Sequence, residues 1–435
     1  MDFSESCGRS IAALLLNERS NNIALIGVQS MHPVSYLTAP AVEVDLAALQ
    51  LDPHKAFRHY RPKTAAIKAG PTYYVLRARH VLPLITDSRT SQFEGSMMAL
   101  RGYPDSGAMS DFMLYSINLT NGDVHRSRRS PLTRAFSKPA VERMRSYVRS
   151  EAQRIAEQLP RGSEFDFLEH FCSPLPGRII AATAGLEPDE WQVFARLIYR
   201  MTTGFAPPFP ADRWPSIESA AEEMYRYVTA ALEDRRKSPR EDFVTAFLAA
   251  TEEAGELSEI EIRSVMLAVL LGGSDTTRGA LNSLHGLLLE HRAQWEAVCK
   301  DPALIPGAIE EALRFEPPVA SVPKMAAQAI DLDGVSIAAG SPLELMTISA
   351  MRDPEMYADP DTFDITRTGG PRIHPVFGGG AHRCAGEYLA RMELEEGLRA
   401  TAAIHPNMEL VGQRRAPGGF SAIREAMPFM VRIPA

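Results

Sequence analysis

The segment Phe377–Gly386 constrains the fold of this chain more than any other part of the sequence. Three consecutive glycines precede His382, Arg383 and Cys384, and a helical pattern follows from about residue 385 to 405. Glycines let a backbone lie close to a flat partner, and the positive end of a helix and a nearby arginine both stabilise a thiolate. Because a low-pKa thiolate binds metal ions, the segment predicts that Cys384 is a metal ligand. A buried inert thiol is the alternative interpretation.

The remaining cysteines support no competing framework. The four cysteines are far apart and form no C-x-x-C pair, which argues against a zinc ribbon, a dithiol redox motif or a disulfide network. Cys7, Cys172 and Cys299 are therefore interpreted as inert thiols. The apolar run Ile11–Leu16 is shorter than the core of a signal peptide and far shorter than a membrane span. We expect a cytoplasmic protein that is neither exported nor anchored to a membrane.

The composition is that of an ordinary globular protein. The 435 residues carry a net charge of −8 and are 45% hydrophobic, which argues against nucleic-acid binding and against a largely disordered chain. No repeat or long linker interrupts the sequence, so one continuous domain over residues 1–435 is predicted. Helical patterns dominate from about residue 123 to 291. Short strands are expected at Tyr73–Ala78, at an Asp-Gly hairpin over residues 331–337, and at Met427–Ile433.

The best-defined helix is predicted to run from Ser258 to about His291. Ser258 and Glu261 have the spacing of a capping box, in which each side chain satisfies a backbone N–H. A helix of about 34 residues is roughly 50 Å long at 1.5 Å per residue, which is enough to cross the molecule. Gly272 and Gly273 lie in its middle, and each costs roughly 1 kcal/mol relative to alanine. Close approach of a flat ligand would explain this glycine pair.

These features resemble the cytochrome P450 family of haem-thiolate monooxygenases, whose cysteine loop follows the pattern Phe-x-x-Gly-x-His/Arg-x-Cys-x-Gly. The loop of this chain supplies Phe377, Gly378, Gly380, His382, Cys384 and Gly386 as cofactor-binding candidates. The resemblance extends from about Tyr73 to the C-terminus and covers the first 70 residues weakly. It implies a mainly α fold with small β-sheets, in which haem b lies between the long central helix and the cysteine-loop helix. Cys384 would bind the iron, and O₂ would be the co-substrate.

Two further family motifs lie before this loop. Glu311 and Arg314 match Glu-x-x-Arg, and the resemblance implies a buried structural pair; an exposed helical pair is the alternative. Asp275 and Thr276 match the acid–alcohol motif of the long helix, and the resemblance implies that they manage protons beside the haem. Hydrogen bonding of both side chains to their own backbone is the alternative interpretation.

A fourth motif and two single residues are candidates for binding the haem propionates. His125 and Arg129 match His-x-x-x-Arg and face the same way at i and i+4. His374, three residues before Phe377, matches a further propionate ligand of the family. Lys324 occupies a position where relatives usually carry arginine. Lysine pairs as a point charge without the bidentate fork of arginine, and the resemblance implies a contact of this kind between Lys324 and a propionate.

The resemblance also implies a substrate class. The pocket-lining positions of the family correspond here to Leu270, Leu271, Val319, Ala320 and Val322. A small, mostly apolar organic molecule is therefore expected as the substrate, oxidised by hydroxylation or oxidative demethylation. Methionines 97, 98, 109 and 113 belong either to this pocket or to the ordinary core.

The source of electrons follows from motifs that the sequence lacks. It contains neither a Gly-x-Gly-x-x-Gly nor a Walker pattern, so we expect no bound flavin or nicotinamide and a separate ferredoxin-like donor with its reductase. Arg126, Arg128, Arg129 and Arg134 concentrate positive charge in one helix and predict the docking face; a solvated basic face is the alternative.

Two other functions remain open at this stage. A haem-thiolate enzyme that does not insert oxygen would need Cys384 but not Asp275 and Thr276. A haem protein that only senses a gas would need neither an electron donor nor a substrate pocket.

Overall fold

The computed structural model describes residues 36–205, 211–371, 374–420 and 422–435. Helices dominate this part of the chain, as predicted. They are α2 (Leu46–Leu51), α3 (Pro53–Tyr60), α4 (Ala78–Leu84), α5 (Ala108–Tyr115), α6 (Gly122–Ala135), α7 (Lys138–Glu142), α8 (Arg145–Glu157), α9 (Pro174–Thr183), α10 (Trp191–Thr202), α11 (Trp214–Lys237), α12 (Phe243–Ala254), α13 (Glu259–Glu290), α14 (Arg292–Lys300), α15 (Ile305–Phe315), α16 (Thr347–Ala350) and α17 (Glu387–Ile404). The run Ile11–Leu16 lies outside the described residues.

The strands form small sheets, which confirms the predicted fold class. They are β1 (Val42–Glu43), β2 (Ala66–Ala69), β3 (Thr72–Val75), β4 (Thr90–Ser91), β5 (Glu164–Asp166), β6 (Val322–Ala326), β7 (Ile330–Leu332), β8 (Val335–Ile337), β9 (Pro342–Leu345), β10 (Glu409–Val411) and β11 (Met430–Arg432). The largest sheet has the order β1-β2-β3-β9-β6-β4, and β10-β11-β5 form a second sheet. The predicted hairpin is β7-β8, in which Asp333 and Gly334 both have positive φ, as a tight hairpin turn requires.

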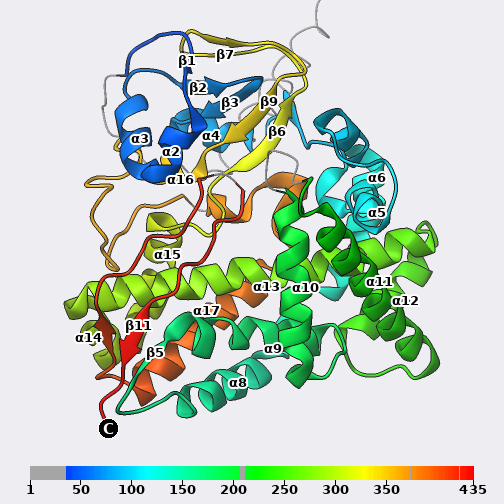
Figure 1. Ribbon diagram of the computed structural model, residues 1–435, viewed down its shortest axis with the longest axis vertical. Coiled ribbons are helices and arrows are strands. Elements are labelled where there is room, and N and C mark those ends of the chain that lie inside the picture. Colours follow the sequence, from blue (N-terminus) through cyan, green and yellow to red (C-terminus); the bar gives the residue numbers. More distant parts are fainter. Residues whose placement is uncertain (1–35, 206–210, 372–373, 421) are drawn as a thin grey trace, which may run out of the picture.

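The long helix α13 crosses the middle of the molecule (Figure 1). The six-stranded sheet lies on one side of it with α2, α3 and α4, whereas α8, α9 and α17 lie on the other (Figure 1). α13 packs against α5, α9, α10, α11, α15 and α17. The predicted capping box is present at its start, formed by Ser258 and Glu261. Among the described residues, no helix is both long enough and apolar enough to cross a membrane.

The two adjacent glycines of α13 have different environments. A Cβ atom on Gly273 would lie 2.5 Å from Cδ1 of Ile180, so Gly273 permits close packing of α13 on α9. Apart from its chain neighbours and the adjacent backbone of α13, no described heavy atom lies within 4 Å of the corresponding position on Gly272. Gly272 is exposed, although Leu271 beside it is buried. The approach of α9 therefore explains Gly273, whereas the Cβ position of Gly272 faces open space.

Candidate active site

The cysteine loop is a tight turn built on glycine. Gly378 has φ 68° and ψ −156°, and Gly380 has φ 59°, both in the region that side chains disfavour. The turn closes where the Cys384 N–H donates a hydrogen bond to the Phe377 carbonyl at 2.8 Å. The Phe377 ring contacts the Arg391 guanidinium at 4.8 Å, which ties the loop to the first turns of α17. The loop thus presents Cys384 immediately before α17.

Cys384 is accessible, although protein atoms surround its thiol. Its residue is exposed, yet the surrounding protein desolvates the thiol strongly enough to raise its pKa above the ordinary value. A hydrogen bond from the Gly386 N–H and the charges of Arg129 and Arg383 act in the opposite direction but do not outweigh burial. The expectation that the loop and helix alone give a low-pKa thiolate is therefore wrong. A bound cation would be needed to favour the thiolate strongly.

One face of α13 borders open space. Gly272 is exposed, and Val269, Gly273 and Thr276 are partly exposed, whereas Leu270 is buried. Residues 269, 272 and 276 lie on one helical face. Leu270 was predicted to line the pocket, but it is 1% exposed and belongs to the main core. Val269, which was not predicted, is partly exposed instead.

The side chains of Asp275 and Thr276 form hydrogen bonds with different partners and not with each other. The Thr276 hydroxyl donates to the Gly272 carbonyl at 2.8 Å, so its proton is committed and its lone pairs are free to accept a hydrogen bond. Asp275 Oδ1 accepts from Nη2 and Nε of Arg278 at 2.6 and 3.0 Å. The backbone-bonded alternative therefore describes Thr276, while Asp275 belongs to an ion pair that the sequence analysis did not predict.

Four basic side chains gather beside the cysteine loop without a carboxylate between them. The rings of His125 and His382 lie 3.8 Å apart, and His125 Nε2 is buried without a hydrogen-bond partner. Burial first, then the charges of His125, Lys324 and Arg129, lower the pKa of His382 to about 3. Burial lowers the pKa of Lys324 to about 8. The described residues provide no anion for this cluster, which fits a ligand that brings its own negative charge.

Arg129 and His374 occupy different positions relative to this cluster. The Arg129 guanidinium donates to the Arg383 carbonyl at 2.6 Å and faces Cys384. His374 is buried, its Nε2 has no hydrogen-bond partner among the described residues, and its charged neighbours are Arg391, Glu387 and Arg314. His374 thus shares with His125 a buried and unpartnered Nε2, and Lys324 lies beside His382 in the basic cluster.

Glu311 and Arg314 form the expected buried pair, with hydrogen bonds of 2.7 and 2.8 Å and side chains 3% exposed. The third member, which no sequence pattern identifies, is Arg367, whose Nε lies 3.2 Å from Glu311. Arg314 also donates to the carbonyls of Met351 and Pro360. The group joins α15 to the segment that leads to the cysteine loop.

The predicted substrate residues divide between the open space and the packed core. Ala320 is fully buried in a second hydrophobic cluster with Phe57 and Tyr74, so its assignment to the pocket is wrong. Val319 and Val322 are partly exposed, and Val319 pairs with Ile423 of the C-terminal segment. Ile423 is 39% exposed and was not predicted, because no motif marks it. The predicted methionines 98, 109 and 113 are buried in the main core.

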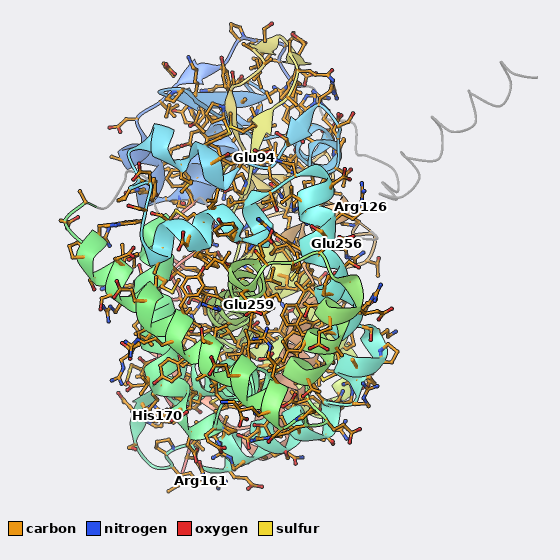
Figure 2. The ribbon with its side chains drawn as sticks, turned by 90° about the vertical axis from the view of Figure 1, so that its right-hand side faces the viewer. Glu94, Arg126, Arg161, His170, Glu256 and Glu259 are labelled. Atoms are coloured by element: carbon orange, nitrogen blue, oxygen red, sulfur yellow. The ribbon has the colours of Figure 1, made fainter. Side chains whose placement is uncertain are left out.

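The predicted docking arginines do not form one basic face. Arg128 is buried and pairs with Glu261 at 3.0 Å, and Arg129 points toward the cysteine loop. The exposed Arg126 and Arg134 pair with Asp123 and Glu253. Acidic side chains accompany Arg126 on the same view of the molecule; these are Glu94, Glu256 and Glu259 (Figure 2). The prediction of a docking face made by these four arginines is therefore wrong.

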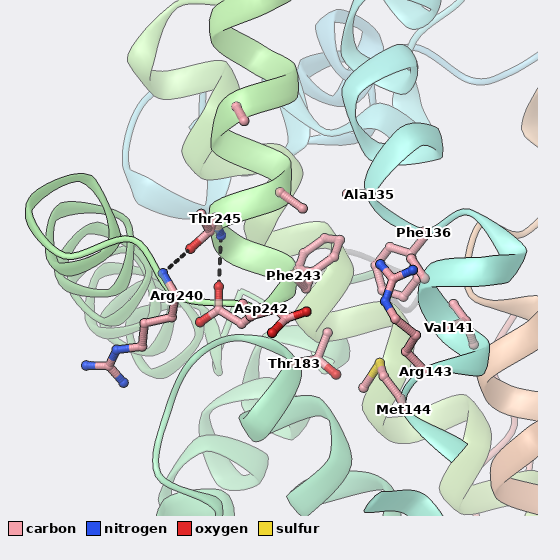
Figure 3. Close-up of a pocket in the computed structure, with 14 residues that line it drawn as sticks. Ala135, Phe136, Val141, Arg143, Met144, Thr183, Arg240, Asp242, Phe243 and Thr245 are labelled. Carbon is pink, nitrogen blue, oxygen red and sulfur yellow. Dashed lines mark hydrogen bonds between the residues drawn. The ribbon is translucent and has the colours of Figure 1, made fainter. Parts of the chain in front are cut away.

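A groove of about 730 Å³ lies elsewhere, between α6, α7, α9 and α12 (Figure 3). Its described lining residues include Phe136, Met144 and Phe243 but none of the predicted site residues. It is therefore separate from the cysteine loop and from the open face of α13.

The residues present fit a haem. The accessible thiol of Cys384, the open space beside Gly272 and the unpartnered Nε2 of His125 supply an iron ligand, room for a flat ring and a donor for an anionic edge. Among the described residues, no cluster of three histidine, cysteine, aspartate or glutamate side chains offers an alternative metal site.

Known proteins similar to this chain come from one family. A family model described as Cytochrome P450 matches residues 303–401. The chain is 37% identical over 391 residues to the plant-inducible cytochrome P450-pinF1 of Rhizobium radiobacter, covering 90% of this chain and 92% of that protein. It is 32% identical over 357 residues to luteothin monooxygenase of Streptomyces thioluteus, covering 81% and 86%. The solved structure of the tirandamycin C-bound P450 monooxygenase TamI gives a TM-score of 0.78 at 27% identity, covering 90% of this chain and 100% of that one.

Proposed function

The chain belongs to the cytochrome P450 family, and from that premise we propose that Cys384 is the ligand of its haem iron. As a member of this family it is an oxidoreductase, a monooxygenase that binds haem b and uses O₂ as co-substrate. When bound, the haem supplies O₂ activation, and electron donation from the thiolate favours O–O cleavage. The observation that carries the proposal is the accessible thiol of Cys384, held beside the donors of the cysteine loop.

The basic cluster is the proposed site of the haem propionates. His125, Lys324 and His382 lie together with no carboxylate among the described residues to neutralise them. Arg129 donates a hydrogen bond to the Arg383 carbonyl and adds positive charge near the Cys384 thiol. These residues hold and orient the cofactor and move no proton.

Thr276 and Asp275 are the proposed proton-handling residues. Thr276 keeps its lone pairs free because its hydroxyl proton is donated to the Gly272 carbonyl, so it can orient a water molecule on the open face of α13. Asp275 immediately precedes Thr276 on the same helix and is the acid nearest to it in the sequence. It exchanges protons with solvent and passes them to that water.

The proposed substrate is a small, mostly apolar organic molecule, which is hydroxylated or oxidatively demethylated. Support comes from the apolar and accessible side chains of Val269, Val319 and Ile423 and from the open space beside Gly272. Among the similar proteins, one is named a luteothin monooxygenase, and the structure of TamI has tirandamycin C bound.

The proposed electron donor is a ferredoxin-like protein served by its own reductase, in a reducing cytoplasm that keeps Cys384 a free thiol. We place its docking surface beside the cysteine loop, on the exposed Lys138 and Tyr388. Arg383 lies nearby but is paired with Glu387 at 2.7 Å. Lys138 Nζ lies 5.7 Å from the Tyr388 ring. An exposed aromatic ring beside basic groups suits an acidic partner.

The ligand assignment is tested by Cys384→His. Because thiolate ligation gives the strongly red-shifted absorption of the reduced carbon monoxide complex, this variant should lose that band even where haem stays bound. Cys299→Ser, which changes a cysteine remote from the cysteine loop, serves as the control and should keep the band. Retention of the band in Cys384→His would remove Cys384 as the iron ligand.

A further inference from the structure

The carboxylate of Asp275 is held by a side chain that the proposed proton route does not use. Arg278, one turn further along α13, donates two hydrogen bonds to the same oxygen of Asp275, at 2.6 and 3.0 Å. Both side chains are largely buried, with exposures of 15% and 12%. Meanwhile the Thr276 hydroxyl bonds to the Gly272 carbonyl. As the helix stands, the acid and the alcohol are not connected to each other.

Arg278 is in turn held from the outside of the helix. Its guanidinium lies 4.3 Å from the centre of the Tyr199 ring on α10, and the Tyr199 hydroxyl hydrogen-bonds Ser173 at the start of α9. A cation–ring contact is stronger when the surroundings exclude water, as they do here. Three helices therefore meet in one chain of contacts that runs from Ser173 through Tyr199 and Arg278 to Asp275.

We propose that Tyr199 is a positioning residue for proton delivery, because its ring keeps Arg278 in place and Arg278 keeps the Asp275 carboxylate turned away from Thr276. The proposal rests on the proposed proton-handling role of Asp275 and Thr276. Arginine stays protonated and cannot supply the proton itself, so the pair with Arg278 restrains Asp275 without replacing it. The carboxylate reaches the water beside Thr276 only when it leaves the guanidinium.

The restraint predicts the sign of the effect of removing the ring. Tyr199→Leu takes away the surface on which Arg278 rests, so Asp275 leaves the pair more often and the proton-dependent step becomes faster. Tyr199→Phe keeps the ring and loses only the hydroxyl bond to Ser173, so it is the matched control. Tyr199 belongs neither to the cysteine loop nor to the basic cluster.

The experiment measures the solvent deuterium isotope effect on turnover of the holoenzyme. The electron donor is saturating, so that electron supply does not limit the rate, and the substrate is one found by spin-state titration. With haem content unchanged, Tyr199→Leu should speed the proton-dependent step about fivefold and bring the isotope effect closer to one. Tyr199→Phe should match the wild type. An unchanged isotope effect in Tyr199→Leu would overturn the proposal. If Tyr199→Leu loses haem, Arg278→Lys, which removes the paired donors and the flat guanidinium, must give the same change or the proposal fails.

A double variant separates this inference from the function on which it rests. If Tyr199 acts through Asp275, Tyr199→Leu should have no further effect in an Asp275→Asn background. An equal effect in both backgrounds would overturn the proposal, because Tyr199 would then act by another route. If Asp275→Asn alone leaves turnover and its isotope effect unchanged, the proton-handling role of Asp275 fails instead.

Discussion

Buried histidines in this molecule are of two kinds. The ring of His285 is satisfied: Nδ1 donates to the Leu281 carbonyl at 2.9 Å, and Nε2 lies 2.9 Å from the Thr401 hydroxyl. His125 and His374 differ because the Nε2 atom of each is buried without a hydrogen-bond partner among the described residues. A satisfied histidine stabilises the core, whereas a buried donor or acceptor without a partner costs free energy unless a ligand completes it. No periodicity in the sequence distinguishes these two cases.

His285 predicts a specific loss of stability in acid. Burial lowers its pKa from 6.5 to about 4, so between these values the unfolded chain binds a proton that the folded protein does not. The free energy of unfolding therefore falls as the pH drops below about 6.5, by about 2 kcal/mol at pH 5. Urea unfolding at pH 7 and pH 5 should show this loss, and His285→Gln should lose that much less than the wild type. The exposed His59→Gln is the control and should behave as the wild type; an equal loss in all three proteins would contradict the prediction.

Lys324 predicts how firmly the chain holds its cofactor. The ammonium is buried without an anionic partner among the described residues, and burial lowers its pKa to about 8, so an anion beside it would restore the charged form. Lys324→Met should speed haem loss by about tenfold or more, because a charge-assisted hydrogen bond contributes ~1.5–3 kcal/mol. Lys324→Arg should slow it by supplying a bidentate fork. Transfer of haem to an excess of apomyoglobin measures both rates, with the exposed Lys55→Met as the control. Equal rates in all variants would show that Lys324 makes no such contact.

At the level of elements, α13 shows what a sequence pattern can and cannot predict. The capping box at Ser258 and the length of the helix are local properties, and both were predicted from the sequence. The role of Gly273 was not, because it depends on Ile180 of α9, which no spacing connects to it. The same reason hid Arg367, Tyr199 and Ile423. Motif residues were found because their neighbours lie close in sequence, and their partners from distant elements were not.

The two glycines of α13 predict opposite outcomes for the same substitution. Gly273→Ala would place a methyl group 2.5 Å from Ile180 Cδ1, and such overpacking costs ~1–3 kcal/mol. Gly272→Ala meets no atom within 4 Å and should raise helix stability by up to ~1 kcal/mol while altering the ferric absorption spectrum. Thermal unfolding and haem content measure the two effects. Ile180→Val should partly rescue Gly273→Ala, and a failure of rescue would point to strain elsewhere.

At the scale of the whole molecule, buried carboxylates join segments that are far apart in the chain. Glu316 pairs with His54 of α3, with Arg352 and with Arg424 of the C-terminal segment. Burial raises the pKa of Glu316, but Arg424 and His54 outweigh burial and hold the pKa well below its usual range. One carboxylate therefore links the β-sheet side of the molecule to the loop that carries Ile423.

The substitution Glu316→Gln should lower the free energy of unfolding, because it breaks the buried ion pairs of Glu316. The substitution leaves Arg352 and Arg424 buried with less compensation, and removal of one partner from a buried pair costs ~3–5 kcal/mol. Chemical unfolding should show a loss of this size. Asp123→Asn, which breaks an exposed pair with Arg126, is the control and should change stability by less than ~1 kcal/mol. Similar small losses of stability in both variants would show that the buried ion pairs of Glu316 do not stabilise the fold.

The outer surface beside the cysteine loop predicts how electrons arrive. Lys138 and Tyr388 are exposed there, whereas the arginines of α6 are buried or paired with acids. If an acidic donor docks on this surface, the second-order rate of reduction should fall steeply as the ionic strength passes about 0.1 M, where the Debye length is ~10 Å. Lys138→Glu should lower that rate severalfold at low salt and weaken its salt dependence, while Lys55→Glu on α3 should leave both unchanged. Stopped-flow reduction by a series of ferredoxins measures the rates. Equal rates for Lys138→Glu and the wild type at low salt would show that the charge at position 138 does not affect association with the donor. The donor would then bind on another face.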